Sequence, residues 1–188
     1  MRTKFYTKMG DKGKTKLGSR TLTKDHQLFD FLGACDQLNS WLGVVASEMN
    51  KKKTKLNRLG GKKAVMEIQN MLFICMAEVA GTYFGSKKSR IRITLANLDF
   101  LEQIVAKIDA GLPPLKHFVI PGGVLAAAKL DYARTLARNV ERMAVALGRK
   151  RKLSPMLLMF LNRLSSALFA MARYENRLGS YSEQAPRY

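Results

Sequence analysis

The sequence is short of several features that define whole classes of protein. It has two cysteines and two histidines in 188 residues, which does not favour a disulfide scaffold or a zinc cluster. No uninterrupted apolar run reaches the roughly 18–20 residues of a membrane span, and no apolar segment near the N-terminus predicts a secretory signal. Cys35 and Cys75 fall among apolar residues at helical spacing and are predicted to be buried thiols, while His26 and His117 are predicted to lie in loops. We therefore expect one globular domain in the cytoplasm, with no membrane partner.

Acidic residues are also scarce. Fourteen Asp and Glu stand against 33 Lys and Arg, which gives a formal net charge of +19 and predicts acidic partners. The basic residues cluster at 2–24, 51–63, 87–92 and 149–152. The last three clusters fall in predicted loops and are explained by a solvated, lysine-rich surface. A nucleic-acid face would need interleaved aromatics or a known reading motif, so phosphorylated ligands are favoured over nucleic acid.

Five amphipathic segments predict helices, and no segment predicts a strand. These segments are 25–50, 63–85, 95–110, 123–147 and 155–176, with apolar residues recurring every three or four positions. Ser154 followed by Pro155 is typical of a helix N-cap and first position. Connections of about ten residues or fewer, apart from 51–62, predict an all-α, five-helix up-and-down bundle.

The two ends of the chain differ from this bundle. Residues 1–24 contain three glycines, hydroxyl groups and lysines but little apolar surface. They form either a disordered segment or a ligand-binding loop laid over the bundle. Residues 177–188 are polar and predict a loose tail.

Residues 6–15, with the sequence YTKMGDKGKT, form the first candidate site. Gly10 and Gly13 let the backbone turn tightly and bring its N–H groups close to an anion. The lysines and threonines add charge and hydroxyl donors for phosphate oxygens. The spacing GxxxxGK[ST] is absent, so this is not a Walker A loop. Taken alone, the motif is equally consistent with a flexible basic tail.

A second candidate site lies on the fourth predicted helix. Arg134, Arg138, Glu141 and Arg142 recur at i, i+4, i+7 and i+8 and therefore share one face. Three guanidinium groups and a carboxylate suit a polyphosphate, with the carboxylate orienting an arginine or a metal. The alternative interpretation is a solvated face of ion pairs.

Two further motifs flank that helix. Asn162 and Arg163 interrupt the apolar last helix, so they need a neighbouring helix or a ligand as partner unless they face solvent. Residues 118–123, FVIPGG, fix a sharp entry to the fourth helix. An aromatic such as Phe118 at this position is more often a core residue than a ligand contact.

Taken in order, these motifs resemble the PduO-type ATP:cob(I)alamin (corrinoid) adenosyltransferase family. The family pattern is YTKxGDxGxT, Lys-Asp, DELNS, FxxPGG, ARTxxRRAER and LNRLSD. The matching segments here are 6–15, 24–25, 36–40, 118–123, 133–142 and 161–166. The resemblance spans residues 4–176. It implies a five-helix bundle with an ordered N-terminal ATP-binding loop, assembled as a homotrimer with active sites between subunits.

The resemblance also implies a reaction and the residues that serve it. Such enzymes transfer the 5′-deoxyadenosyl group of ATP to cob(I)alamin and release triphosphate, with Mg²⁺ carried on the ATP phosphates. The residues implied at ATP are Thr7, Lys8, Met9, Gly10, Thr15, Lys16, Lys24, Arg138, Asn139, Val140, Glu141, Arg142 and Asn162. Among these, Arg138, Glu141 and Asn162 are the expected catalytic residues. Phe118 is implied at the corrinoid, and Asp36 with Arg134 in a salt bridge between subunits.

The resemblance divides the single domain, residues 1–188, into a nucleotide-binding loop at 1–24, a helical bundle at 25–176 and a tail at 177–188. A corrinoid reductase or a mutase is the protein partner that it suggests. No protein nucleophile is needed, because the cobalt centre attacks and the protein orients ATP and stabilises the departing triphosphate.

The sequence departs from the family pattern at several positions. Asn139 replaces the second Arg of the RR pair, Val140 replaces Ala, Gln37 replaces Glu and Ser166 replaces Asp, while Lys14 and Lys16 add charge to the loop. A charged hydrogen bond lost at Asn139 would cost about 1.5–3 kcal/mol. The leading hypothesis is an adenosyltransferase. The second is a relative that binds ATP or corrinoid without turnover, and the third is a basic helical protein that binds nucleic acid.

Overall fold

The computed structural model describes residues 5–6, 8–17, 20–49, 56, 60–84 and 91–188. In this part of the chain five helices form a bundle, which confirms the predicted fold class. They are α1 (Gln27–Met49), α2 (Gly61–Phe84), α3 (Leu95–Asp109), α4 (Leu125–Gly148) and α5 (Pro155–Leu178). Each helix begins and ends within two residues of its predicted bounds.

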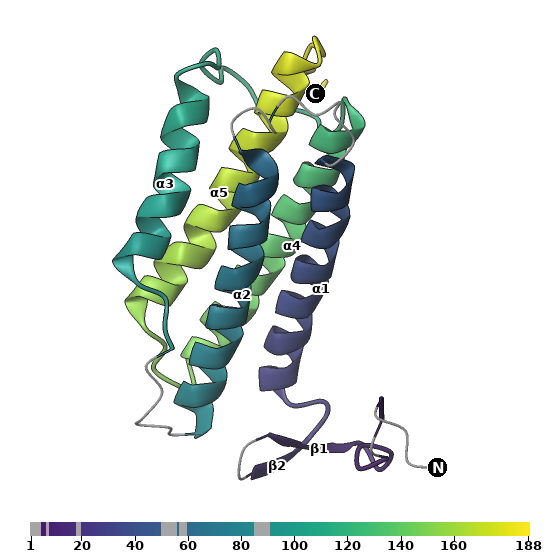
Figure 1. Cartoon of the computed structure of the whole chain (residues 1–188), viewed down its shortest axis with the longest axis vertical. Helices are drawn as coiled ribbons and strands as arrows, with labels where there is room; N and C mark the ends of the chain where they lie inside the picture. The colour runs from purple at the N-terminus through teal and green to yellow at the C-terminus, as the bar shows by residue number, and fades with distance from the viewer. Residues whose placement is uncertain (1–4, 7, 18–19, 50–55, 57–59, 85–90) are drawn as a thin grey trace.

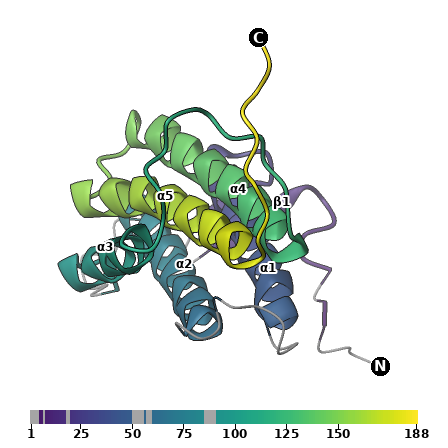
Figure 2. The same cartoon turned by 90° about the horizontal axis from the view of Figure 1, so that it is seen from above.

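The helices run up and down with nearly aligned axes (Figure 1). α1 packs against α2 and α4, and α5 packs against α4 and α3. Figure 2 shows α4 and α5 side by side along one flank of the bundle. Phe31 of α1 and Phe160 of α5 are both completely buried in the core. The outer sides of α4 and α5 remain available to carry a site.

The start of α5 follows the sequence signals. The Ser154 hydroxyl oxygen accepts a hydrogen bond from the Leu157 N–H at 3.1 Å, and Pro155 occupies the first helical turn. This confirms the predicted N-cap pair, which satisfies one of the free N–H groups of the first turn.

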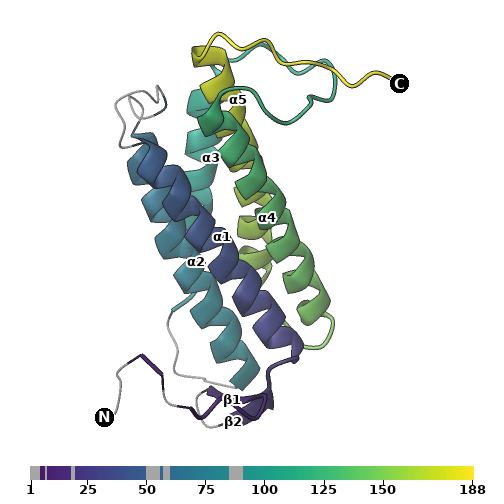
Figure 3. The ribbon, with the colours of Figure 1, turned by 90° about the vertical axis from the view of Figure 1, so that its right-hand side faces the viewer.

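The expectation of no strand was wrong, because the N-terminal segment contains a β-hairpin. Strands β1 (Lys14–Leu17) and β2 (Arg20–Thr23) pair antiparallel, with Thr15 opposite Leu22. Leu17 and Leu22 are partly buried and pack against the core, while Lys16 and Thr21, the neighbours of these leucines within the strands, are exposed. This alternation has the period of a strand, but each run is only four residues long. Figures 1 and 3 show the hairpin beyond the end of the bundle at which α1 begins.

The connection between α3 and α4, residues 110–124, is longer than the short connections that the sequence predicted. The tail also differs from the loose segment expected at 177–188. α5 continues to Leu178, and the following residues lie along the 110–124 connection. One backbone hydrogen bond joins them, from the Ile120 N–H to the Gln184 carbonyl oxygen at 2.9 Å.

Helices α2 and α5 are long and apolar enough to cross a bilayer by length and composition, with mean hydropathies of 1.3 and 1.4. Their apolar residues serve the bundle instead. Val65, Ile68 and Leu72 of α2 are completely buried in the core, as are Leu161 and Leu168 of α5. A core helix of a bundle satisfies the same length and composition test, so these two helices do not argue for a membrane span.

Both cysteines are free and buried, as the sequence predicted. Burial raises the pKa of the Cys35 thiol to about 12, with a smaller contribution from the negative charge of Asp36. Burial also raises the pKa of Cys75, and Cys35 and Glu78 add to this effect. Both thiols therefore behave as small apolar core residues.

Candidate functional site

Polar side chains from α4 and α5 meet on the outer side of the bundle. The Asn162 side-chain amide of α5 donates to the Glu141 carboxylate of α4 at 2.8 Å. Arg163 donates to the other amide atom of Asn162 at 3.0 Å and to Glu102 of α3 at 3.2 Å. The partners that Asn162 and Arg163 needed are thus supplied by neighbouring helices. The Glu102 contact also means that Arg163 is paired although Ser166 replaces the Asp of the family pattern.

The three arginines of α4 share a face but differ in their partners. Arg134 donates to Asp131 one turn earlier at 3.2 Å, and its guanidinium lies 5.9 Å from the centre of the Phe169 ring. Arg142 donates to the side-chain oxygen of Asn139 at 3.3 Å. Arg138 is exposed and forms no hydrogen bond or ion pair with the residues that the structure describes. Its guanidinium is therefore free to bind an anion.

Val140 belongs to the core side of the same helix. Its side chain is completely buried among the other helices. Its predicted place at ATP is therefore not available to the side chain, which instead fixes the helix against the bundle. Asn139 and Glu141, its neighbours in sequence, are half-buried at the edge of the polar face.

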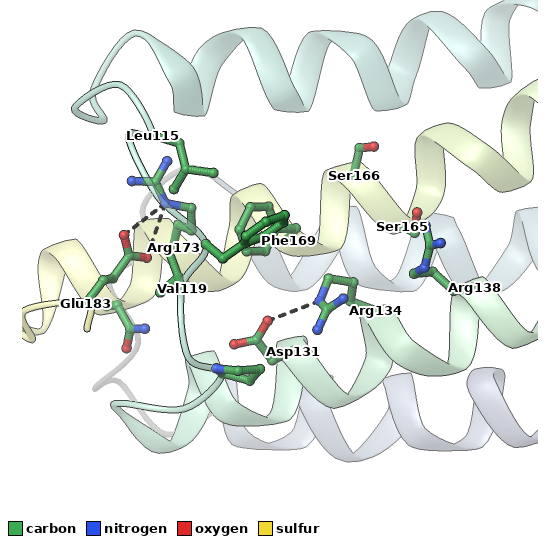
Figure 4. Close-up of a pocket in the computed structure, with 13 residues that line it drawn as sticks. Leu115, Val119, Asp131, Arg134, Arg138, Ser165, Ser166, Phe169, Arg173 and Glu183 are labelled. Atoms are coloured by element: carbon green, nitrogen blue, oxygen red, sulfur yellow. Dashed lines mark hydrogen bonds and ion pairs between the residues drawn. The ribbon is translucent and has the colours of Figure 1, made fainter. Parts of the chain in front are cut away.

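A hollow of about 410 Å³ opens beside this polar face. α4 contributes Asp131, Arg134 and Arg138, and α5 contributes Ser166, Phe169 and Arg173. Figure 4 shows these side chains converging from the two helices, with Leu115 and Val119 of the 110–124 connection at one end. Charged groups and an aromatic surface thus line one cavity, as a site for a large ligand with both polar and apolar parts requires.

Phe118 lies at the rim of this hollow, and 78% of its surface is exposed. The interpretation of this aromatic as a core residue is therefore wrong. The connection enters α4 at Gly123, whose φ of +100° favours glycine. The Asn176 side chain lies so close that a Cβ on Gly123 would clash with it. This tight entry keeps the connection close to α5 and leaves the Phe118 ring facing solvent.

The N-terminal loop forms a second polar cluster. Its backbone turns at Lys8, where φ is +60°, and again at Gly13, where φ is +69°. The Gly13 N–H donates to the Gly10 carbonyl at 3.2 Å, and the Lys24 N–H donates to the Gly13 carbonyl at 2.8 Å. These bonds bring the Lys24 ammonium against Gly10, so that a Cβ there would lie 3.0 Å from Nζ.

The remaining predicted residues of this loop have different surroundings. The Lys8 ammonium lies 5.9 Å from the centre of the Tyr6 ring, and Met9 is exposed. Thr15 is half-buried on β1 and Lys16 is exposed on the same strand. Thr7 lies outside the described residues, so its predicted role has no structural account.

His26 joins this loop to the bundle, a role that the sequence analysis missed. Its Nδ1 accepts a hydrogen bond from the Leu28 N–H at 3.0 Å, so the proton of the neutral ring is on Nε2. Nε2 therefore donates to the Tyr83 hydroxyl of α2. The Arg151 guanidinium in turn lies 5.1 Å from the centre of the Tyr83 ring. The available signal was the position of His26 directly before a helix, where side-chain acceptors cap free N–H groups.

The structure brings together only part of the predicted site. Arg138, Asn139, Glu141, Arg142 and Asn162 gather on one face of α4 and α5. The N-terminal hairpin instead lies beyond the end of the bundle (Figure 3). Asp36 is exposed on α1, while the partner of Arg134 within the described chain is Asp131.

The hollow also has charged and amide side chains that were not predicted: Asp131, Arg173, Asn176 and Glu183. Asn176 is 3% exposed and lies near the C-terminal end of α5. A buried polar residue in such a place needs a hydrogen-bond partner, which is the signal that could have identified it. The sequence holds no comparable signal for Glu183, since its partner Arg173 is on the preceding helix.

Comparisons with known proteins agree with this architecture. The sequence model of the family described as cobalamin adenosyltransferase matches residues 5–175. A corrinoid adenosyltransferase of Citrobacter freundii is 38% identical, over 92% of this chain and 94% of that protein. One of Bacillus subtilis is 35% identical, over 92% and 86%.

A solved structure with a similar fold is a variant of the PduO-type ATP:corrinoid adenosyltransferase from Lactobacillus reuteri, complexed with cobalamin and ATP. It is 33% identical and has a TM-score of 0.88, over 98% of this chain and all of that one. A second variant from the same organism, complexed with ATP, has a TM-score of 0.84 at 32% identity.

Proposed function

Because the chain belongs to the cobalamin adenosyltransferase family, we propose that it transfers the 5′-deoxyadenosyl group of ATP to cob(I)alamin. The cobalt(I) centre of the substrate supplies the electron pair that forms the bond to C5′. The bond between C5′ and the triphosphate oxygen breaks, and triphosphate leaves with the electron pair of that broken bond. The protein's task is to align the two substrates and to stabilise the charge of the leaving group.

The observation that carries this proposal is the junction of two different surfaces on α4 and α5. A polar face with the free guanidinium of Arg138 adjoins a hollow with the exposed aromatic ring of Phe118 at its rim. A polyphosphate matches the first surface, and a large, flat ring system with both polar and apolar parts matches the second. One such junction suits a reaction between ATP and a corrinoid.

Arg138, Glu141 and Asn162 form the catalytic group in this proposal. Arg138 binds the triphosphate and neutralises charge as the leaving group departs. The Glu141–Asn162 hydrogen bond, at 2.8 Å, fixes both side chains before ATP arrives. Asn139 holds Arg142 beside them. The N-terminal loop supplies further phosphate contacts through Lys8, Gly10, Lys16 and Lys24, with Met9 and Thr15 beside the nucleoside.

Phe118 serves the corrinoid. An exposed aromatic ring at the rim of the hollow can occupy the lower face of the corrinoid and keep an axial ligand and water away from the cobalt. A corrinoid that has lost this donor ligand is reduced from cobalt(II) to cobalt(I) more easily.

A Mg²⁺ ion fits this site only as a companion of ATP. Among the described residues there is no group of three or more His, Cys, Asp or Glu that could hold a metal ion. Mg²⁺ commonly binds substrate phosphates with one or two protein carboxylates, and Glu141 is placed to be one of these. The ion would add positive charge at the triphosphate.

We further infer a homotrimer in which the N-terminal loop of one subunit meets the α4–α5 face of another. Within one chain the hairpin lies beyond the end of the bundle at which α1 begins (Figure 3), whereas the hollow is lined by α4, α5 and the 110–124 connection. Asp36, Ser40 and Val44 form an exposed stripe along α1, and Val44 is 42% exposed. Such a stripe could bring Asp36 to Arg134 of a neighbouring subunit. Light scattering of the purified protein measures the assembly directly.

The proposal places the protein in the cytoplasm, where a corrinoid reductase or a mutase that uses the product would be its partner. Asn139 and Ser166 depart from the family pattern, yet Asn139 binds Arg142 and Arg163 is paired with Glu102. The polar face is therefore intact, which supports catalysis over the alternative that the protein only binds ATP or corrinoid.

The proposal is tested by anaerobic incubation with ATP, Mg²⁺ and chemically reduced cobalamin. We expect the light-sensitive absorption spectrum of adenosylcobalamin to develop, and triphosphate to appear in equal amount. Arg138→Ala should lower kcat/KM by about a hundredfold to a thousandfold, as expected for a group that stabilises developing charge. Arg149→Ala, an exposed arginine at the end of the same helix, is the matched control and should retain full activity. No product with enzyme in excess of cobalamin would refute the proposal.

A further inference from the structure

We propose that residues 179–188 form a strap that holds the Phe118-bearing connection in place, with Glu183 as a positioning residue for corrinoid binding. The inference rests on the proposed role of Phe118 at the corrinoid. It assigns a task to a segment that the sequence predicted to be loose. The residues that match the family end at 175, so Glu183 and Gln184 lie outside that match.

The first contact of the strap is with Arg173, which also binds the 110–124 connection. Arg173 of α5 donates through Nε to both carboxylate oxygens of Glu183, at 3.2 and 3.0 Å. Its Nη2 also donates to the Pro113 carbonyl in the 110–124 connection, at 3.4 Å. The Arg173 and Glu183 side chains are only 11% and 20% exposed, so solvent screens the pair weakly. One guanidinium therefore binds the strap and the connection together, and Figure 4 shows its bonds to Glu183.

The second contact lies next to Phe118. The Ile120 N–H donates to the Gln184 carbonyl at 2.9 Å, which pairs the strap with the middle of the connection. A second hollow of about 450 Å³ lies between these two segments, and Phe118 lines it together with Pro186 and Tyr188 of the strap. The Phe118 ring thus stands between a hollow built on α4 and α5 and a hollow built partly by the strap.

Among the described residues, the other side chains that bind the connection do so near its exit. Asn176 donates to the Gly122 carbonyl at 2.9 Å and accepts from the Val124 N–H at 3.0 Å. Asp131 accepts from the Gly122 N–H at 3.3 Å. These bonds fix the backbone that enters α4 but leave the segment around Phe118 to the strap. The strap therefore sets the position of the ring that faces the corrinoid, while the α4–α5 polar face does not depend on it.

Two variants test this assignment: Glu183→Gln, which removes the charge, and a chain truncated after Ser182, which removes both contacts. We expect the KM for cob(I)alamin to rise about tenfold in the truncated chain and about threefold in Glu183→Gln, because charged hydrogen bonds are lost. The KM for ATP should stay at its original value, and the Tm should fall only slightly, because Arg173 loses its carboxylate partner. Glu48→Gln is the matched control, since the Lys129–Glu48 pair has a similar exposure of 19% and 22% on another part of the bundle.

Hydrogen exchange supplies a readout that does not need the corrinoid. The Ile120 amide should exchange faster in the truncated chain, while amides inside α4 remain protected. If the original protein makes adenosylcobalamin but both variants keep its KM for cob(I)alamin, the strap has no positioning role and the proposal fails. An equal rise in both KM values would show general destabilisation and would also overturn it. If the original protein makes no adenosylcobalamin, the proposed function fails, and unchanged Ile120 exchange would still reject the strap.

Discussion

The N-terminal segment and the 110–124 connection both lie outside the helices and contain glycines, yet they are built differently. The N-terminal turns are closed by backbone bonds between their own residues, as between Gly10 and Gly13. The 110–124 connection is closed by side chains of other elements, including Asn176 and Asp131. The first segment is therefore attached mainly at its base, and the second is held near its ends and at its middle.

This difference follows from what each segment is proposed to bind. A small, highly charged ligand such as a triphosphate can order a basic loop around itself, since each lysine gains a strong charge-assisted bond on binding. A corrinoid offers mainly van der Waals contact, so its site gains affinity from a ring held in place beforehand. Substitutions in the two segments should therefore have separable effects on the two substrates.

The largest difference between the two segments is expected in the destabilisation caused by substituting one glycine in each. Gly123→Ala makes a Cβ clash with the Asn176 side chain and forces alanine to adopt a positive φ. We therefore expect about 3–4 kcal/mol of destabilisation. Gly13 also has positive φ, but nothing lies within 4 Å of its added Cβ, so Gly13→Ala should cost about 1 kcal/mol. Urea unfolding measures both values. Equal costs would show that the Asn176 anchor contributes nothing.

The next largest effect concerns the binding of ATP alone. Lys24→Ala removes the ammonium beside Gly10 and should raise the KM for ATP about tenfold, as expected for one charged hydrogen bond. The KM for cob(I)alamin should not change. Lys12→Ala, an exposed lysine of the same loop outside the predicted set, is the control. Steady-state kinetics with each substrate varied in turn measures both KM values. A rise in the KM for cob(I)alamin in Lys24→Ala would contradict separate effects on the two substrates.

A smaller effect is expected at the base of the N-terminal segment. Tyr83→Phe removes the hydroxyl that accepts from His26, at a cost of about 1 kcal/mol. Because His26 also caps the start of α1, this loss should loosen the hairpin without moving the 110–124 connection. Hydrogen exchange at β1 should speed up while exchange at Ile120 is unaffected. A change at both places would mean that the two segments are coupled through the bundle.

The smallest effect is expected in the core. A thiol whose pKa is raised to about 12 is almost wholly protonated at neutral pH, so Cys35 should react very slowly with a thiol reagent. The same should hold for Cys75. Because both folded pKa values are raised, the thiols contribute stability below their ordinary pKa and lose it as pH rises through the folded values. Fast labelling in Gly123→Ala would show that damage had spread from the connection into the bundle.

The sequence by itself determined the helical bundle, because long stripes of apolar residues recur at helical spacing and Ser154–Pro155 marks a helix start. It also determined the face of α4, since Arg138, Glu141 and Arg142 are brought together by the helix period alone. The resemblance to a family then identified both substrates. Each of these inferences depends on neighbours in sequence or on ordered motifs.

Tertiary structure decided the rest. The hairpin was missed because four-residue strands carry too few positions to show a period of two. The exposure of Phe118 depends on Asn176, more than fifty residues away, and on the conformation of Gly123. The strap depends on Arg173 meeting both Glu183 and Pro113. Contacts between distant residues leave no periodic trace, so only the packed helices could bring these groups together.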